Sequence, residues 1–127
     1  MNLATFAAVG MGAALGAWLR WGLGTWLNPA FALIPLGTLV ANLVGGLAMG
    51  FALAAVQAWP GMAPALKLLL TTGLLGGLTT FSTFSAEAFH LLQRGALGWL
   101  GLHLAVHVVG SVVMTWAGYT LLNALRS

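Results

Sequence analysis

The sequence predicts an all-α integral membrane protein with four transmembrane helices. Of its 127 residues, 61% are hydrophobic and only 4% are charged, whereas a soluble domain carries roughly a quarter charged residues. Four basic residues and one acidic residue cannot cover a water-soluble surface. Four helices of about 20 residues, with short connections, use nearly the whole chain. We therefore expect a single transmembrane domain, 1–127, with no room for a soluble catalytic domain.

The charges exclude one class of partner. The net charge of +3 comes from scattered residues and not from a basic patch, so the pI of 10.9 does not indicate nucleic-acid binding. The chain has no cysteine, which rules out disulfides and thiolate metal sites. The apolar start lacks a basic segment before it, and Arg20 stands where a cleavage site would be expected. A retained first helix is therefore favoured over a signal peptide.

The first predicted helix spans about 3–25. Gly12 and Gly16 form a pair of small residues that lets another helix approach closely. Arg20 lies between Trp18 and Trp21, and tryptophans commonly anchor at the membrane interface. Two interpretations of Arg20 stay open: its side chain extends to the lipid headgroups, or it faces a water-filled vestibule and attracts anions. Its position alone favours the headgroups.

The second predicted helix, about 36–57, carries two polar side chains on one face. Thr38 and Asn42 are four residues apart. A carboxamide inside an apolar span is costly unless it is paired. Asn42 is expected either to make a hydrogen bond between helices or to offer N–H donors to a passing anion, and the first role is slightly favoured.

The third predicted helix, about 65–94, is long for one span. Gly73, Gly76 and Gly77 cluster at its middle, and we predict a break near 73–79. Irregular backbone at membrane depth is tolerated only where protein, water or ions satisfy it. The alternative is that the glycines only allow close helix crossing, and spacing alone does not decide between the two.

The fourth predicted helix, about 97–123, carries a polar stripe that we expect to face protein or a pore. The stripe is His103, His107, Ser111 and Thr115, at successive i,i+4 positions. His103 and His107 have the spacing of a two-histidine metal pair, but the only further candidate ligands are Glu87 and His90. A metal site is disfavoured on this basis.

The loop charges give no orientation signal. Lys67 and Arg126 fall on one side of the predicted membrane, and Arg20 and Arg94 on the other. Orientation normally follows an excess of Lys and Arg on the cytoplasmic side. We therefore hypothesise insertion in both orientations and pairing as an antiparallel homodimer.

The segment 73–85 combines glycines, hydroxyl groups and two phenylalanines inside the third helix. A small, strongly hydrated anion needs donors that replace its water. Phe81 and Phe84, one turn apart, have ring edges that are electropositive and attract anions. Spacing alone nevertheless favours ordinary packing for these rings, and it does not identify an ion. The candidate donors are the side chains of Asn42, Thr80, Ser82, Thr83, Ser85, His107 and Ser111.

The segment Gly76-Gly77-Leu78-Thr79-Thr80-Phe81-Ser82-Thr83-Phe84-Ser85 resembles the signature of the Fluc (CrcB) fluoride channels. The likeness extends over essentially the whole chain. It implies a dual-topology antiparallel homodimer in the cell membrane, the inner membrane of a bacterium. Two parallel pores would export toxic cytoplasmic fluoride passively, giving fluoride resistance, and would exclude chloride.

The resemblance also assigns residues. Phe81 and Phe84 would be ring-edge fluoride ligands, and Asn42 the polar contact on helix two. Arg20 would be the vestibule cation, and the backbone carbonyls of Gly76 and Thr79, from both subunits, would hold a structural sodium ion. The polar track would include Thr38, Ser82, Thr83 and Ser111, with His107 where relatives can carry a tyrosine.

Three rival functions remain. A proton-coupled antiporter of the small multidrug-resistance type also has four helices and dual topology, but it needs a membrane-buried carboxylate, usually in helix one, and Glu87 lies in helix three. A non-transporting assembly subunit would leave the hydroxyl run unexplained. No nucleophile, metal cluster or phosphate loop indicates an enzyme.

Overall fold

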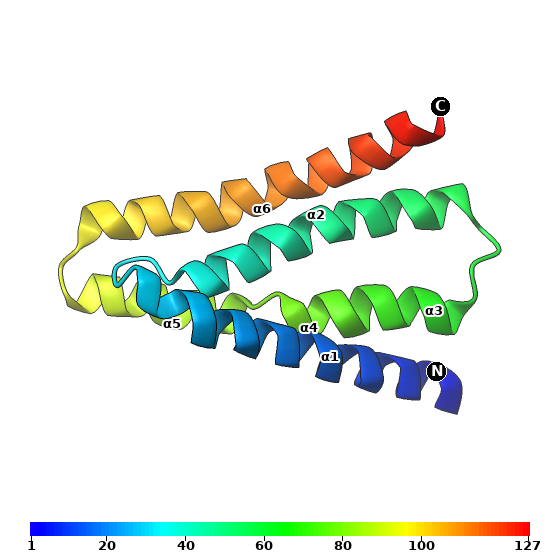
Figure 1. The fold of residues 1–127 in the computed structure, drawn as a ribbon, viewed down its shortest axis with the longest axis horizontal. Coiled ribbons are helices and arrows are strands. Elements are labelled where there is room, and N and C mark those ends of the chain that lie inside the picture. The colour runs from blue at the N-terminus through cyan, green and yellow to red at the C-terminus, as the bar shows by residue number, and fades with distance from the viewer.

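The structure, a computed structural model, describes residues 1–127 as a bundle of long helices (Figure 1). Four stretches are long and apolar enough to cross a membrane, so the chain is a multi-pass membrane protein and the prediction of four spans is confirmed. The helices are α1 (Leu3–Leu27), the 3₁₀ turn η1 (Asn28–Ala30), α2 (Leu36–Ala58), α3 (Pro64–Leu68), the π-helix η2 (Leu69–Leu75), α4 (Gly76–Leu78), α5 (Phe81–Gln93) and α6 (Leu97–Arg126).

Helix α2 lies between α6 on one side and α1 with the third span on the other (Figure 1). Glycines set how closely these helices cross. A Cβ atom on Gly16 would overlap the backbone of Leu74 and Leu78 in the third span, and one on Gly50 would overlap the backbone of Thr115 in α6. The predicted close approach at Gly16 is therefore present, and it fixes α1 against the third span.

The third span is interrupted. Its helix widens into the π-helix η2, continues through α4, and then stops at Thr79 and Thr80, which have extended backbones before α5 begins. The interruption lies at the end of the predicted 73–79 region and just beyond it. Gly77 itself packs against the backbone of Ala13 in α1, so the glycines serve close crossing and the break follows them.

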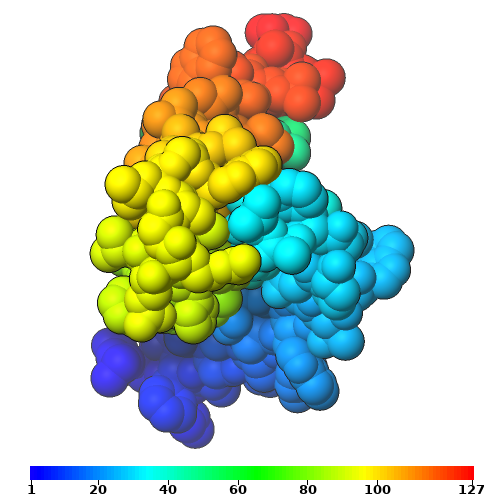
Figure 2. Space-filling view, turned by 90° about the vertical axis from the view of Figure 1, so that its left-hand side faces the viewer, coloured from blue at the N-terminus to red at the C-terminus, as the bar shows by residue number.

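The two ends of the bundle carry different connections. Both termini and the 59–63 loop lie at one end, while residues 28–35 and 94–96 lie at the other (Figure 1). Figure 2 looks onto this second end, where the segment around residue 31 lies beside the start of α6. There the ring centroids of Phe31 and Trp99 are 5.6 Å apart. Arg126, at the C-terminus, and Arg94, in the 94–96 loop, therefore lie at opposite ends of the bundle.

Candidate functional site

Asn42 of α2 holds the break in the third span. Its Oδ1 accepts a hydrogen bond from the Thr80 amide at 2.7 Å, and its Nδ2 donates to the Thr80 carbonyl at 3.1 Å. Because a backbone N–H can only donate, this pair also fixes which end of the Asn42 amide is the oxygen. Nδ2 lies 3.0 Å from Nδ1 of His107 in α6. One side chain thus satisfies both backbone groups of Thr80 and joins three spans.

The break releases the backbone carbonyls of Gly76, Gly77, Leu78 and Thr79 from their usual helical donors, and Arg20 binds that of Gly77. In a continuous α-helix the amides of Thr80 and Thr83 would donate to the carbonyls of Gly76 and Thr79. Here the Thr80 amide donates to Asn42, and the Thr83 amide donates to the hydroxyl of Thr80, which caps α5. Gly76 is also exposed at the surface of the single chain. Neutral carbonyl oxygens of this kind suit a hard cation.

A cavity of about 420 Å³ opens beside the break. It brings together predicted site residues from three spans, and the released carbonyl of Thr79 belongs to a residue at its wall. No Lys, Arg, Asp or Glu lines it, so the cavity carries no permanently charged side chain. The lining comprises Asn42, Gly45, Gly46, Met49, Thr79, Thr80, Phe81, Phe84, His107, Val108, Ser111 and Thr115.

The two phenylalanines at this cavity have different surroundings. Their ring centroids are 5.5 Å apart at an interplanar angle of 49°. Phe84 is 5% exposed and stacks on His103 with centroids 5.0 Å apart, whereas Phe81 is 78% exposed. Packing within the chain accounts for Phe84 but not for Phe81.

A second cavity, of about 340 Å³, lies on the other side of Thr80. Thr80 lines both cavities, so the break separates them. Arg20 lines the second one and its Nε donates to the carbonyl of Gly77 at 3.0 Å. The extension of Arg20 to lipid headgroups, favoured by position alone, is therefore wrong, because the guanidinium binds the protein backbone. The other lining residues are Trp21, Gly24, Thr25, Asn28, Thr38 and Thr83.

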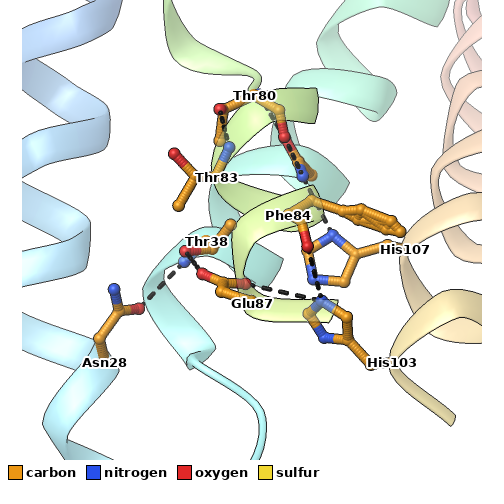
Figure 3. A network of polar contacts seen from close by, with 9 residues as sticks. Asn28, Thr38, Thr80, Thr83, Phe84, Glu87, His103 and His107 are labelled. Carbon is orange, nitrogen blue, oxygen red and sulfur yellow. Dashed lines mark hydrogen bonds and ion pairs between the residues drawn. The ribbon is translucent and has the colours of Figure 1, made fainter. Parts of the chain in front are cut away.

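A buried polar network connects this second cavity to α6 (Figure 3). The Thr38 hydroxyl donates to Glu87 Oε1 at 2.5 Å, and Glu87 Oε2 lies 3.7 Å from Nε2 of His103. Asn28 Oδ1 accepts from the Thr38 amide near the start of α2. His103 is fully buried and its Nε2 lies 3.3 Å from the carbonyl of Phe84.

The structure separates the predicted site residues into groups. Asn42, His107 and Ser111 meet at the first cavity with both phenylalanines, while Thr38 and Thr83 line the second. Ser82 is exposed and lines neither cavity; its hydroxyl lies 3.4 Å from that of Thr80.

Sequence reasoning considered Glu87 and His103 only in a disfavoured metal site and did not single out Thr80 from the hydroxyl run. The signal for the first two was available, because Glu87 is the only acidic residue and His103 begins the polar stripe of the fourth span.

These features define a small four-span membrane protein with two cavities, one on either side of a broken third span. The chain belongs to the CrcB family, since the family model described as "CrcB-like protein, Camphor Resistance (CrcB)" matches residues 7–119. The sequence resemblance to this family is thereby confirmed.

Proteins similar to this chain carry one common name. The "Fluoride-specific ion channel FluC" of Aromatoleum aromaticum is 67% identical over 98% of this chain and 95% of its own length. The protein of the same name from Thiobacillus denitrificans is 52% identical over 98% of this chain and 100% of its own length. That from Pseudomonas aeruginosa is 55% identical over 91% of this chain and 91% of its own length. These names are those of channels and not of enzymes.

Proposed function

We propose that the chain is a fluoride-selective channel that lets cytoplasmic fluoride leave a bacterial cell passively through the inner membrane. The carrying observation is the cavity without a charged side chain at the broken third span, in a chain 67% identical to a fluoride-specific channel over nearly its whole length. Fluoride must exchange its hydration shell for close donors to cross lipid. The absence of a fixed cation in this cavity keeps binding weak enough for release.

The proposed path runs from the Arg20 cavity, past Thr80, to the cavity beside Phe81 and Phe84. Arg20 attracts the anion at the second cavity, where Thr83 supplies a hydroxyl group and Thr38, whose O–H donates to Glu87, forms part of the wall. At the first cavity the ring edges of the phenylalanines present their positive rims to the anion, and Ser111 extends the polar track. Ser82 adjoins the track only at the hydroxyl of Thr80.

His107 offers a further donor. In the neutral ring the bond donated by Asn42 to Nδ1 leaves the proton on Nε2. This Nε2 atom is buried and has no hydrogen-bond partner. An unpaired buried N–H is costly, and a passing fluoride ion would satisfy it. Asn42, by contrast, acts mainly through Thr80 and His107, because both its N–H groups are already bonded.

The working unit in this proposal is an antiparallel homodimer. Phe81 is 78% exposed although it lines the proposed path, so a second copy would supply the missing wall. The equal division of basic residues between the two ends is consistent with insertion in both orientations. Tags on the termini should then be accessible from both sides of the membrane; access from one side alone would contradict the dimer.

A structural sodium ion is proposed at the two-fold axis of this dimer. Its ligands would be the carbonyls of Gly76 and Thr79 from both copies, which are among the carbonyls that lose their helical donors at the break. Such an ion would supply positive charge between the two pores and would replace the missing amide donors. Nothing else in the proposal depends on it.

The test is ion efflux from liposomes that contain the purified protein. Potassium fluoride or potassium chloride is loaded, and valinomycin is added to carry the potassium. Fluoride should leave rapidly without any proton gradient, and chloride should stay. Equal release of both ions, or of neither, contradicts the proposal. The alternative function is a proton-coupled antiporter, because Glu87 is a carboxylate in the buried network. Release of fluoride only when a proton gradient is imposed would favour that antiporter.

A further inference from the structure

Three neighbouring residues of α5 and α6 each carry one buried polar side-chain atom without a hydrogen-bond partner. The atoms are Glu87 Oε2, His103 Nδ1 and His107 Nε2, and they are the only such side-chain atoms in the protein. Buried polar groups are nearly always paired, so unpaired ones indicate a bound water or ion, or a functional role. Because the three residues are neighbours, their unpaired atoms point to a missing ligand at this cluster, which His103 would bind through the Nε2 atom that faces Glu87.

The geometry of this cluster suits a metal ion. One potential ligand atom from each residue lies within 4.8 Å of the other two. The two histidines come from successive turns of α6, with ring centroids 4.5 Å apart, and Glu87 faces them from α5 (Figure 3). The side chains of His103 and Glu87 are 0% and 11% exposed, and His107 is 3% exposed as a residue.

We propose that Glu87, His103 and His107 bind a divalent transition metal ion, with Zn²⁺ as the ion that fits best. Two imidazoles and one carboxylate form a common protein ligand set for zinc, which leaves a fourth position for water. Ligand atoms about 2 Å from a tetrahedral ion are roughly 3.3 Å from one another, so the cluster contracts on binding. No Lys or Arg is bonded to the three residues. Nε2 of His103 donates to the carbonyl of Phe84, so metal binding through Nε2 requires this proton to move to the unpaired Nδ1.

Only His107 of the three lines the first cavity, so an ion would enter the cluster past this residue. Coordination through Nε2 of His107 requires its proton to move to Nδ1. Nδ1 would then become a donor facing the N–H of Asn42, which the Thr80 amide holds in place. Metal binding therefore works against the contact between Asn42 and His107. A carboxylate at position 42 would instead accept from Nδ1 and form a carboxylate–histidine–metal arrangement.

If the proposed function holds, an ion bound here also obstructs fluoride. It would occupy the one orphan donor that His107 offers to the anion, and it would alter the contact that holds the break. External or internal Zn²⁺ should then slow fluoride efflux reversibly, with recovery after a chelator is added.

The test of the site itself does not use transport. Co²⁺ is added to the purified protein in detergent and its visible absorption is followed, and Zn²⁺ is then used to displace it. We expect one Co²⁺ per chain with the intense absorption of a tetrahedral site. His103→Asn and Glu87→Gln should each weaken binding by at least about tenfold, since loss of a partner beyond the ligands alone costs about 10- to 100-fold. Asn42→Asp should tighten binding by about tenfold for the reason given above.

His90→Asn is the matched control, because His90 is exposed at the end of α5 and lies outside the cluster. Elution as a single species in size-exclusion chromatography shows that each variant is folded. If His103→Asn does not fold, the near-isosteric Glu87→Gln alone tests whether the cluster binds the metal. Absence of the tetrahedral spectrum, equal binding in Glu87→Gln, or a loss of binding in His90→Asn overturns the metal site. Cobalt binding without fluoride transport would instead support the site and contradict the proposed function.

Discussion

Asn42→Ala removes the side chain that holds the interruption of the third span. The change deletes three hydrogen bonds, two to the backbone of Thr80 and one to His107. Side-chain hydrogen bonds inside membrane proteins contribute about 0.6 kcal/mol on average and about 1.7 kcal/mol at most. The three together give a loss in the free energy of unfolding of about 2 kcal/mol at the average value and about 5 kcal/mol at the maximum.

The assay is reversible unfolding of the purified protein in mixed micelles, with the free energy of unfolding compared with that of the wild type. Asn123→Ala is the matched control, because Asn123 lies near the end of α6 and its side chain makes no hydrogen bond. Amide hydrogen exchange gives a local readout. The Thr80 amide should exchange faster in Asn42→Ala, since it has lost its acceptor. If both alanine variants lose the same stability, or if the Thr80 amide stays protected, the break is not held by Asn42.

Three further substitutions test separate parts of the account. Phe84→Leu should slow fluoride efflux about fivefold, because a ring contact of about 1 kcal/mol is lost from the path. Phe89→Leu is the control, because Phe89 is exposed and lies outside both cavities. Equal efflux in the two variants would show that Phe84 only packs. Gly16→Ala should lower the free energy of unfolding by about 1–3 kcal/mol, because the added methyl meets the backbone of the third span. Gly22→Ala meets nothing within 4 Å, and an equal loss there would contradict the close crossing. Thr38→Val should lower the free energy of unfolding by about 0.6–1.7 kcal/mol, because Glu87 loses its donor. Thr72→Val, at an exposed position, should lower it less. The reverse order would refute the buried network.

The sequence predicts the spans because hydropathy and length are summed over about twenty residues at a time. The sequence also predicts the position of the break to within two residues, since glycines and hydroxyl groups cluster at that part of the third span. The exact position could not be predicted, because it depends on Asn42, which comes from another span 38 residues away in the chain. A local pattern cannot show which backbone groups a distant side chain will capture.

The same limit applies to the site. The i,i+4 stripe correctly predicts that His103 and His107 face protein, and both are buried. Their unpaired atoms and the approach of Glu87 depend on how α5 returns against α6 after the break. Arg20 shows the opposite error: its place among tryptophans is typical of a headgroup anchor, but the released backbone of the third span offers it the carbonyl of Gly77.

The central claim is that neutral donors and aromatic edges at the break conduct fluoride in preference to chloride. The most direct measurement is the reversal potential across a planar bilayer that contains the purified protein, with fluoride on one side and chloride at equal concentration on the other. The account predicts a large potential whose sign corresponds to movement of fluoride alone. A potential near zero, or one of the opposite sign, would contradict it.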